Sequence, residues 1–64
     1  MDRFLTLADV ERATSLKKSK LYDLIRHGDF PPQHRITERR RAWLASDVDA
    51  WIRQRANIPA ERVL

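Results

Sequence analysis

Three consecutive arginines are the residues of this sequence best suited to binding an anion. Arg39, Arg40 and Arg41 lie within residues 36–44, ITERRRAWL, directly before an apolar segment. Guanidinium groups stay charged, bind phosphates through paired hydrogen bonds and are weakly hydrated enough to enter a narrow minor groove of DNA. A run of charge in a loop is more often only a solvated surface, so other residues have to distinguish the two interpretations.

A second basic cluster lies earlier in the chain, in the segment SLKKSKLYDLIRHG. Lys17, Lys18 and Lys20 fall at the start of a predicted helix, where the helix dipole makes positive charge unfavourable. Three cations at this end cost stability unless an anion binds beside them. The pattern therefore favours contact with a polyanion over a plain polar helix surface.

The excess positive charge is confined to the middle of the chain, whose formal net charge is +4. Residues 17–41 carry eight basic and three acidic side chains, a net charge of +5, and the remaining residues carry five basic and six acidic ones. A one-sided basic footprint indicates a nucleic acid or an anionic membrane as partner. Because no segment joins basic residues to a broad apolar face for lipid, we expect double-stranded DNA and no membrane.

Other classes of protein do not fit the composition. The 64 residues include no cysteine, which agrees with a reducing compartment and removes thiolate metal sites. His27 and His34 are too few and too far apart for a metal site, and the sequence offers no nucleophile–base set and no glycine-rich phosphate loop. We also find no signal peptide or membrane-spanning segment. We expect a cytoplasmic protein, nucleoid-associated when bound, that is not an enzyme and needs no cofactor or metal.

The first helix is predicted over residues 7–13, after an extended segment at residues 4–5. Thr6, with Asp9 three residues later, matches a capping box. Leu7, Val10 and Ala13 recur at helical spacing and form one apolar face. This helix is followed by a turn of only a few residues.

The second helix is predicted over residues 18–27 and carries the lysine cluster at its start. Leu21, Leu24 and Ile25 share its apolar face. Gly28, the only glycine in the chain, stands where a helix commonly ends, and the prolines that follow prevent any continuation.

A hairpin and a third helix are predicted after the prolines. Two short extended segments, residues 33–36 and 42–44, would be joined by a turn that carries the arginines. Ser46 is expected as the N-cap of a helix over residues 47–55, with Asp49 three residues on. Trp43 and Trp51 fall on apolar faces, so we predict them in the core and not as platforms for stacked bases.

The order helix, short turn, helix, hairpin, helix predicts a winged helix-turn-helix, a fold that is mainly α with a small β-hairpin. We expect a DNA-binding domain over residues 1–56 and a flexible tail over residues 57–64. In this fold the second helix meets base edges in the major groove, and the hairpin, or wing, reaches the neighbouring minor groove. An alternative for Arg41 is a place on the strand, paired with an acid of the third helix. The predicted DNA-binding residues are Lys17, Lys18, Ser19, Lys20, Tyr22, Asp23, Arg26, Arg39, Arg40 and Arg41.

Residues 4–52 resemble the AlpA-type phage and prophage regulators, which are MerR-like winged helices related to excisionases. The order and spacing of the shared elements are more specific than any one of them. The matching residues are Leu5 and Thr6, then Ser19, Leu21, Tyr22, Leu24 and Ile25, then Gly28, Phe30 and Pro31, and finally Trp43, Asp47, Val48, Trp51 and Ile52. The family usually has glycine where this chain has Ser15 and serine where it has Lys17, and many members have a wing glycine that this chain lacks.

The resemblance implies a sequence-specific DNA-binding protein of a mobile element. Such proteins regulate promoters, act as excisionases (recombination directionality factors), or do both. An excisionase binds repeated sites, bends the DNA and contacts an integrase, so a tyrosine integrase and cooperative self-association on DNA are expected partners.

Two alternatives stay open at the level of sequence. The chain is mainly a protein–protein adaptor in the first, with Ile58, Val63 and Leu64 of the tail docking on a partner. In the second it is a DNA-packaging subunit, because fold alone does not specify function.

Overall fold

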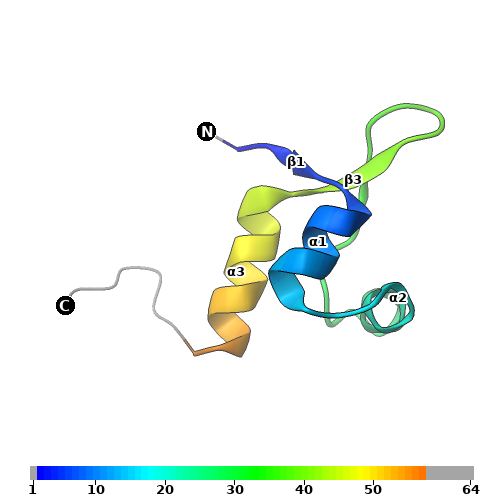
Figure 1. Cartoon of the computed structure of the whole chain (residues 1–64). Coiled ribbons are helices and arrows are strands. Elements are labelled where there is room, and N and C mark those ends of the chain that lie inside the picture. Colours follow the sequence, from blue (N-terminus) through cyan, green and yellow to red (C-terminus); the bar gives the residue numbers. More distant parts are fainter. Residues whose placement is uncertain (1, 58–64) are drawn as a thin grey trace.

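The computed structural model describes residues 2–57. In chain order, the described residues form β1 (Phe4–Leu5), α1 (Leu7–Thr14), α2 (Lys18–Arg26), β2 (His34–Arg35), β3 (Arg41–Leu44) and α3 (Ala45–Arg55) (Figure 1). This order confirms the predicted winged helix-turn-helix. Of the expected tail, only Asn57 belongs to the described residues, and residues 58–64 lie outside them.

The strands form a small antiparallel sheet in the order β1-β3-β2. The predicted hairpin is confirmed by β2 and β3, which pair His34 with Ala42. The sequence did not predict that β1 pairs with the other side of β3, with Leu5 opposite Trp43. Two residues are too few to display the alternation that marks a strand, so this pairing becomes visible only in the fold.

The core lies between the sheet and the three helices, and Trp43 is its largest fully buried side chain. The Phe30 ring meets both indoles edge-on, with centroids 6.3 Å from Trp43 and 4.8 Å from Trp51. Indole Nε1 of Trp43 donates to the carbonyl of Pro31 over 2.9 Å, and that of Trp51 donates to the carbonyl of Asp29. The predicted core position is confirmed for Trp43, and the half-buried Trp51 packs against the core. Both tryptophans hold the segment that leaves α2.

The turn between α1 and α2 is short because α1 is capped at both ends. The predicted capping box is confirmed, since Asp9 N donates to Thr6 Oγ1 and Thr6 N donates to the Asp9 carboxylate. At the other end Ser15 adopts a left-handed conformation, with φ 63°, and its amide donates to the carbonyl of Glu11. Glycine adopts this conformation most easily, and a serine holds it in this chain.

A Schellman motif ends α2 at Arg26, one residue before the predicted end. The amide of Gly28 donates to the carbonyl of Ile25, and that of Asp29 donates to the carbonyl of Leu24. This arrangement requires a left-handed residue between the helix and the next segment. Gly28 supplies it with φ 75°, so the expected role of the glycine is confirmed.

The predicted start of the third helix is wrong. Helix α3 begins at Ala45, directly after β3, and Leu44 occupies the N-cap without a side-chain hydrogen bond. Ser46 is therefore not the N-cap: its amide and hydroxyl donate to the carboxylate of Asp2, over 3.0 and 2.6 Å. The amide of Ala45 donates to the carbonyl of Arg3. The first turn of α3 is thus satisfied by the N-terminal segment, a contact between residues far apart in sequence.

The stability of the fold at acid pH tests the capping of α1 by Asp9 and of α3 by Asp2. Hydrogen bonds from the hydroxyl and amide of Ser46 lower the pKa of Asp2, and the bond from the Thr6 amide is the main cause that lowers the pKa of Asp9. A carboxylate with a lowered folded-state pKa stabilises the fold above its unfolded value of about 4. That contribution is lost as the pH falls through the folded value.

We expect the midpoint temperature of thermal unfolding to fall as the pH drops below about 4, and to fall less in the double variant Asp2→Asn/Asp9→Asn. The matched control is Asp49→Asn, which removes a surface carboxylate that is paired with Arg53 on the same helix. Circular dichroism at a series of pH values measures the effect. Identical pH profiles for the wild type and the double variant would contradict the capping roles.

Candidate nucleic-acid interface

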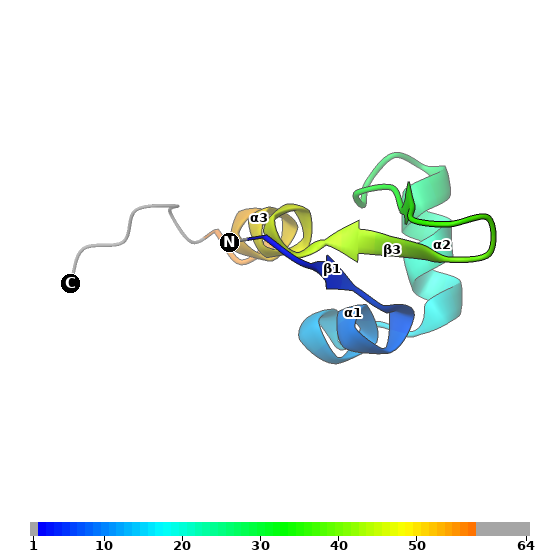
Figure 2. The same ribbon diagram turned by 90° about the horizontal axis from the view of Figure 1, so that it is seen from above.

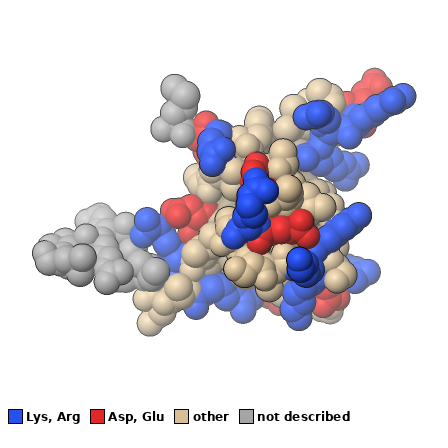
Figure 3. All heavy atoms as spheres, in the orientation of Figure 1, with Lys and Arg blue, Asp and Glu red and all other residues tan. Residues whose placement is uncertain are grey.

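Helix α2 and the wing, defined as residues 36–40 between β2 and β3, lie on the same side of the molecule. In Figure 1 the wing stands above α2 on this side, and in Figure 2 both lie on the opposite side from α3. In Figure 3 lysine and arginine side chains project along the side on which Figure 1 places these two elements. We call α2 with Lys17, β2, the wing and Arg41 the basic end.

The amino end of α2 presents cations without a cap of its own. Lys17 is the N-cap residue, it makes no side-chain capping hydrogen bond, and the first turn holds no acidic residue. Lys17, Lys18, Ser19 and Lys20 are all exposed. The positive end of the helix dipole and the three ammonium groups therefore act in the same direction, as an anion-binding site requires.

The outward face of α2 carries both acidic and basic side chains. Ser19, Asp23 and Arg26 lie opposite the buried Leu21, and Arg26 Nη2 contacts Asp23 Oδ1 over 3.2 Å. Tyr22 is half-buried and turned toward the loop before β2, where its hydroxyl accepts a hydrogen bond from Gln33 Nε2 over 3.0 Å. This bond ties α2 to the segment that enters the hairpin.

The wing forms a tight turn without glycine, because the side chain of Thr37 takes over part of the hydrogen bonding. Its Oγ1 accepts from the amides of Arg39 and Arg40, over 3.3 and 3.1 Å. The amide of Ile36 donates to the carbonyl of Arg40 and closes the loop. Both arginines at the tip are exposed, as the sequence predicts for residues that contact DNA.

Arg41 is the first residue of β3, and it is exposed. Its place on the strand agrees with the alternative drawn from the sequence, but the expected pair with an acid of α3 is wrong. Within residues 2–57, Asp47 instead contacts His34, over 3.5 Å, and Asp49 contacts Arg53, over 2.8 Å.

One basic residue of this surface was missed by the sequence analysis. Arg35 is exposed on β2 directly opposite Arg41 on β3. Like charges opposite each other on paired strands are unfavourable, so this pair resembles the lysine cluster in favouring a bound anion. Only the register of the hairpin shows that Arg35 faces Arg41, and the sequence did not predict that register.

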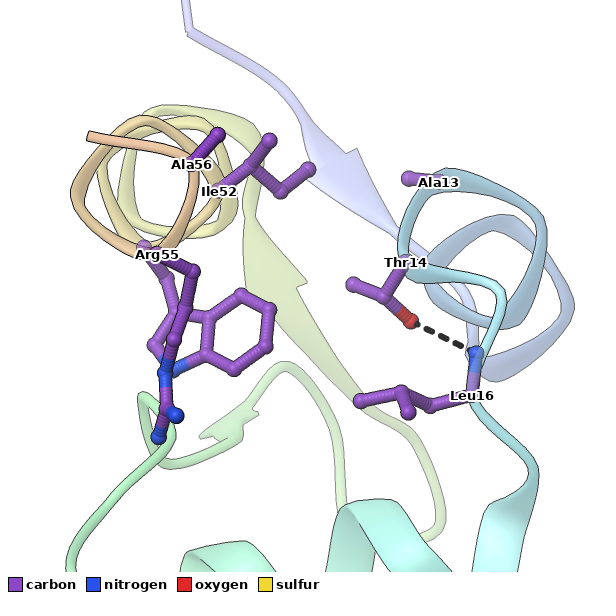
Figure 4. A pocket seen from close by; sticks show the side chains of 7 residues that line it. Ala13, Thr14, Leu16, Ile52, Arg55 and Ala56 are labelled. Atoms are coloured by element: carbon purple, nitrogen blue, oxygen red, sulfur yellow. Dashed lines mark hydrogen bonds between the residues drawn. The ribbon is translucent and has the colours of Figure 1, made fainter. Parts of the chain in front are cut away.

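An apolar groove lies between α1 and α3. Thr14 and Leu16 point into it from one side and Ile52 from the other (Figure 4). The guanidinium of Arg55 lies over the ring of Trp51, 5.0 Å from its centre.

Residues 2–57 contain neither a cluster of metal-ligating side chains nor a membrane-spanning helix. No group of three or more His, Asp or Glu side chains is arranged to hold a metal ion. No helix among these residues has the length and apolar character needed to cross a bilayer.

The helix-turn-helix pair α1–α2, followed by the hairpin and α3, defines a winged helix-turn-helix protein. The family model described as prophage CP4-57 regulatory protein (AlpA) matches residues 3–56, and the chain belongs to this family. The resemblance stated from the motifs is thereby confirmed. The family is one of phage regulators, which is consistent with a regulatory role in DNA binding.

A curated relative of this chain is also a phage protein. The uncharacterized protein ORF88 of Enterobacteria phage P4 is 43% identical over 51 residues, which cover 80% of this chain and 58% of the phage protein. The chain thus matches less than two thirds of that relative's length.

The hydrogen bond between Tyr22 and Gln33 is measurable by a double-mutant cycle. Tyr22→Phe and Gln33→Leu each remove one partner, and each should lower the free energy of unfolding by about 1 kcal/mol. Because the two groups contact each other, the double variant should lose less than the two single losses combined, by roughly 0.5 kcal/mol or more. Urea unfolding followed by tryptophan fluorescence measures the three losses.

The matched control is a second cycle that pairs Tyr22 with Gln54, a glutamine exposed on α3, in place of Gln33. Tyr22→Phe and Gln54→Leu should be additive. Additive losses for Tyr22 and Gln33 as well would mean that the bond does not tie α2 to the hairpin.

Proposed function

We propose that this protein is a sequence-specific DNA-binding regulator of a mobile element, with α2 in the major groove and the wing in the neighbouring minor groove. The observation that carries the proposal is the gathering of two separate basic clusters at one end of the fold. The lysines at the start of α2 and the arginines of the wing are exposed there. In each cluster the positive charges are unfavourably placed, and binding of a polyanion would relieve their electrostatic repulsion.

Within the proposal, the basic residues divide into two roles. Lys17, Lys18 and Lys20 suit phosphates, because an ammonium group is a flexible point charge. Arg39 and Arg40 at the wing tip suit a narrow minor groove, where weakly hydrated guanidinium groups are favoured. Ser19, Asp23 and Arg26 then remain for base edges, and Tyr22 for the sugar–phosphate backbone.

Finer functions also belong to this proposal. Membership in a family of phage regulators supports control of a promoter, excision of the element as a recombination directionality factor, or both. The same basic end would serve each of them. A small domain gains specificity by binding adjacent sites, so the proposal includes cooperative self-association on DNA. It also includes contact with a tyrosine integrase and a location in the cytoplasm.

A second candidate function is that of a protein–protein adaptor. The apolar groove between α1 and α3 favours it, because exposed apolar surface is commonly used for binding proteins. The part of the adaptor hypothesis that uses residues 58–64 lies outside the described residues. A DNA-packaging subunit would use the basic end, as the regulator does.

Salt dependence of DNA binding tests the role of the wing. If about four to six phosphates are neutralised, log affinity should fall with log salt with a slope of about −4 to −5. Arg39→Ala/Arg40→Ala should make this slope less steep by about 2 and weaken binding at least about tenfold. Fluorescence anisotropy with a labelled duplex, titrated at several salt concentrations, measures both quantities.

The matched control, Arg12→Ala/Arg53→Ala, removes the same charge from α1 and α3, where both arginines have acidic partners. It should leave the slope nearly unchanged. Equal effects of the two double variants would mean that only net charge matters and that the wing makes no specific contact.

A further inference from the structure

Asp23 is the one acidic residue of α2, and it works against binding of a polyanion. The helix otherwise offers lysine, serine and arginine to DNA. A carboxylate at this place repels phosphates, so under the proposed function its presence calls for a compensating role.

The position of Asp23 is central on the surface that would face DNA. Successive residues of a helix are rotated by about 100°, so Asp23 lies beside Ser19 on the side opposite Leu21, with Arg26 on the other flank of Ser19. Leu21 is fully buried, whereas 44% of the Asp23 side chain is exposed. No residue of α2 places an acid closer to the middle of the outward face.

The contacts of Asp23 do not account for it as a structural residue. Its Oδ1 is 3.2 Å from Arg26 and 3.8 Å from His27, both of them exposed partners on the same helix turn. Exposed ion pairs of this kind contribute little to stability. Among residues 2–57, both of these contacts go to Oδ1 and neither involves Oδ2.

We propose, on the basis of the proposed function, that Asp23 is a specificity-determining residue that selects cytosine over guanine and thymine in the major groove. An ionised carboxylate only accepts hydrogen bonds. Cytosine presents an amino donor, N4, on the groove edge, whereas guanine presents N7 and O6 and thymine presents O4, all of them acceptors. Adenine also presents an amino donor, N6, but beside the acceptor N7. Asp23 Oδ2 therefore accepts from cytosine N4 and repels guanine and thymine at the same position.

The neighbouring Arg26 offsets part of the negative charge of the carboxylate. Its guanidinium contacts Oδ1, so Oδ2 is the atom that remains to meet the base. Specificity then arises from repulsion of the wrong bases as much as from attraction to the right one. Asp23 lowers the affinity for every sequence that places guanine or thymine at its position.

The test begins with selection of binding sites from a random pool of duplexes by the full chain. Dissociation constants are then measured for the selected site, for its three substitutions at each position, and for a random duplex. The variants are Asp23→Asn, which keeps the shape of the side chain, and Arg26→Ala. Asp49→Asn is the matched control, because it removes an acid paired with an arginine four residues later on α3. Circular dichroism verifies that each variant is folded.

We expect wild type to prefer cytosine over guanine or thymine at one position by about 5- to 150-fold. Asp23→Asn should lose that preference at that position alone and bind the random duplex more tightly, by about twofold or more. A purely structural role would instead weaken binding to both duplexes. Arg26→Ala should keep the cytosine preference, and Asp49→Asn should behave as wild type.

Three results would overturn the inference. A wild-type site whose base preferences are unchanged in Asp23→Asn would reject Asp23 while leaving the proposed function intact. Loss of the same preference in Asp23→Asn and Arg26→Ala would mean that Asp23 only positions Arg26. Failure of the wild type to enrich any site would reject the proposed function itself, together with this inference.

Discussion

Burial of Trp43 is the contact on which the arrangement of the basic end depends. Its indole lies in the central strand β3, opposite Leu5, and is inaccessible to solvent. The ring packs against Phe30, and Nε1 donates to the carbonyl of Pro31. One side chain thus joins the strand that leaves the wing to the segment that leaves α2. Large buried aromatic residues contribute several kcal/mol to stability, and here that stabilisation also fixes the two basic elements relative to each other.

The stability of the fold and the charge of its surface oppose each other. Lys17, Lys18 and Lys20 stand at the unfavourable end of a helix dipole, and Arg35 faces Arg41 across the hairpin. A chain of this size has a limited core with which to offset such repulsion. Contacts outside the charged face add stability: the capping box of α1, the cap that the N-terminal segment provides for α3, and the aromatic cluster. In this account a bound polyanion relieves the repulsion.

Local patterns in the sequence were sufficient for the order of elements. The capping box at Thr6, the apolar spacing of α2 and the left-handed Gly28 depend on residues within one or two turns of each other, and each is present in the structure. The failures concern contacts between distant residues. Asp2 satisfies the start of α3 through Ser46, and Arg35 meets Arg41 only once the hairpin register is set. The predicted lysines and wing arginines are exposed at one end, but contact with DNA stays a prediction for all of them.

The central claim is that one end of this molecule holds two adjacent grooves of a single duplex. Hydroxyl-radical and methylation footprinting of the full chain on its selected site tests it most directly. The account predicts guanine N7 protection in one major-groove segment, for α2, and backbone protection across the minor groove on one flank, for the wing. Removing Arg39 and Arg40 should abolish only the flanking protection. Protection confined to one groove, or no site-specific protection, would contradict the account.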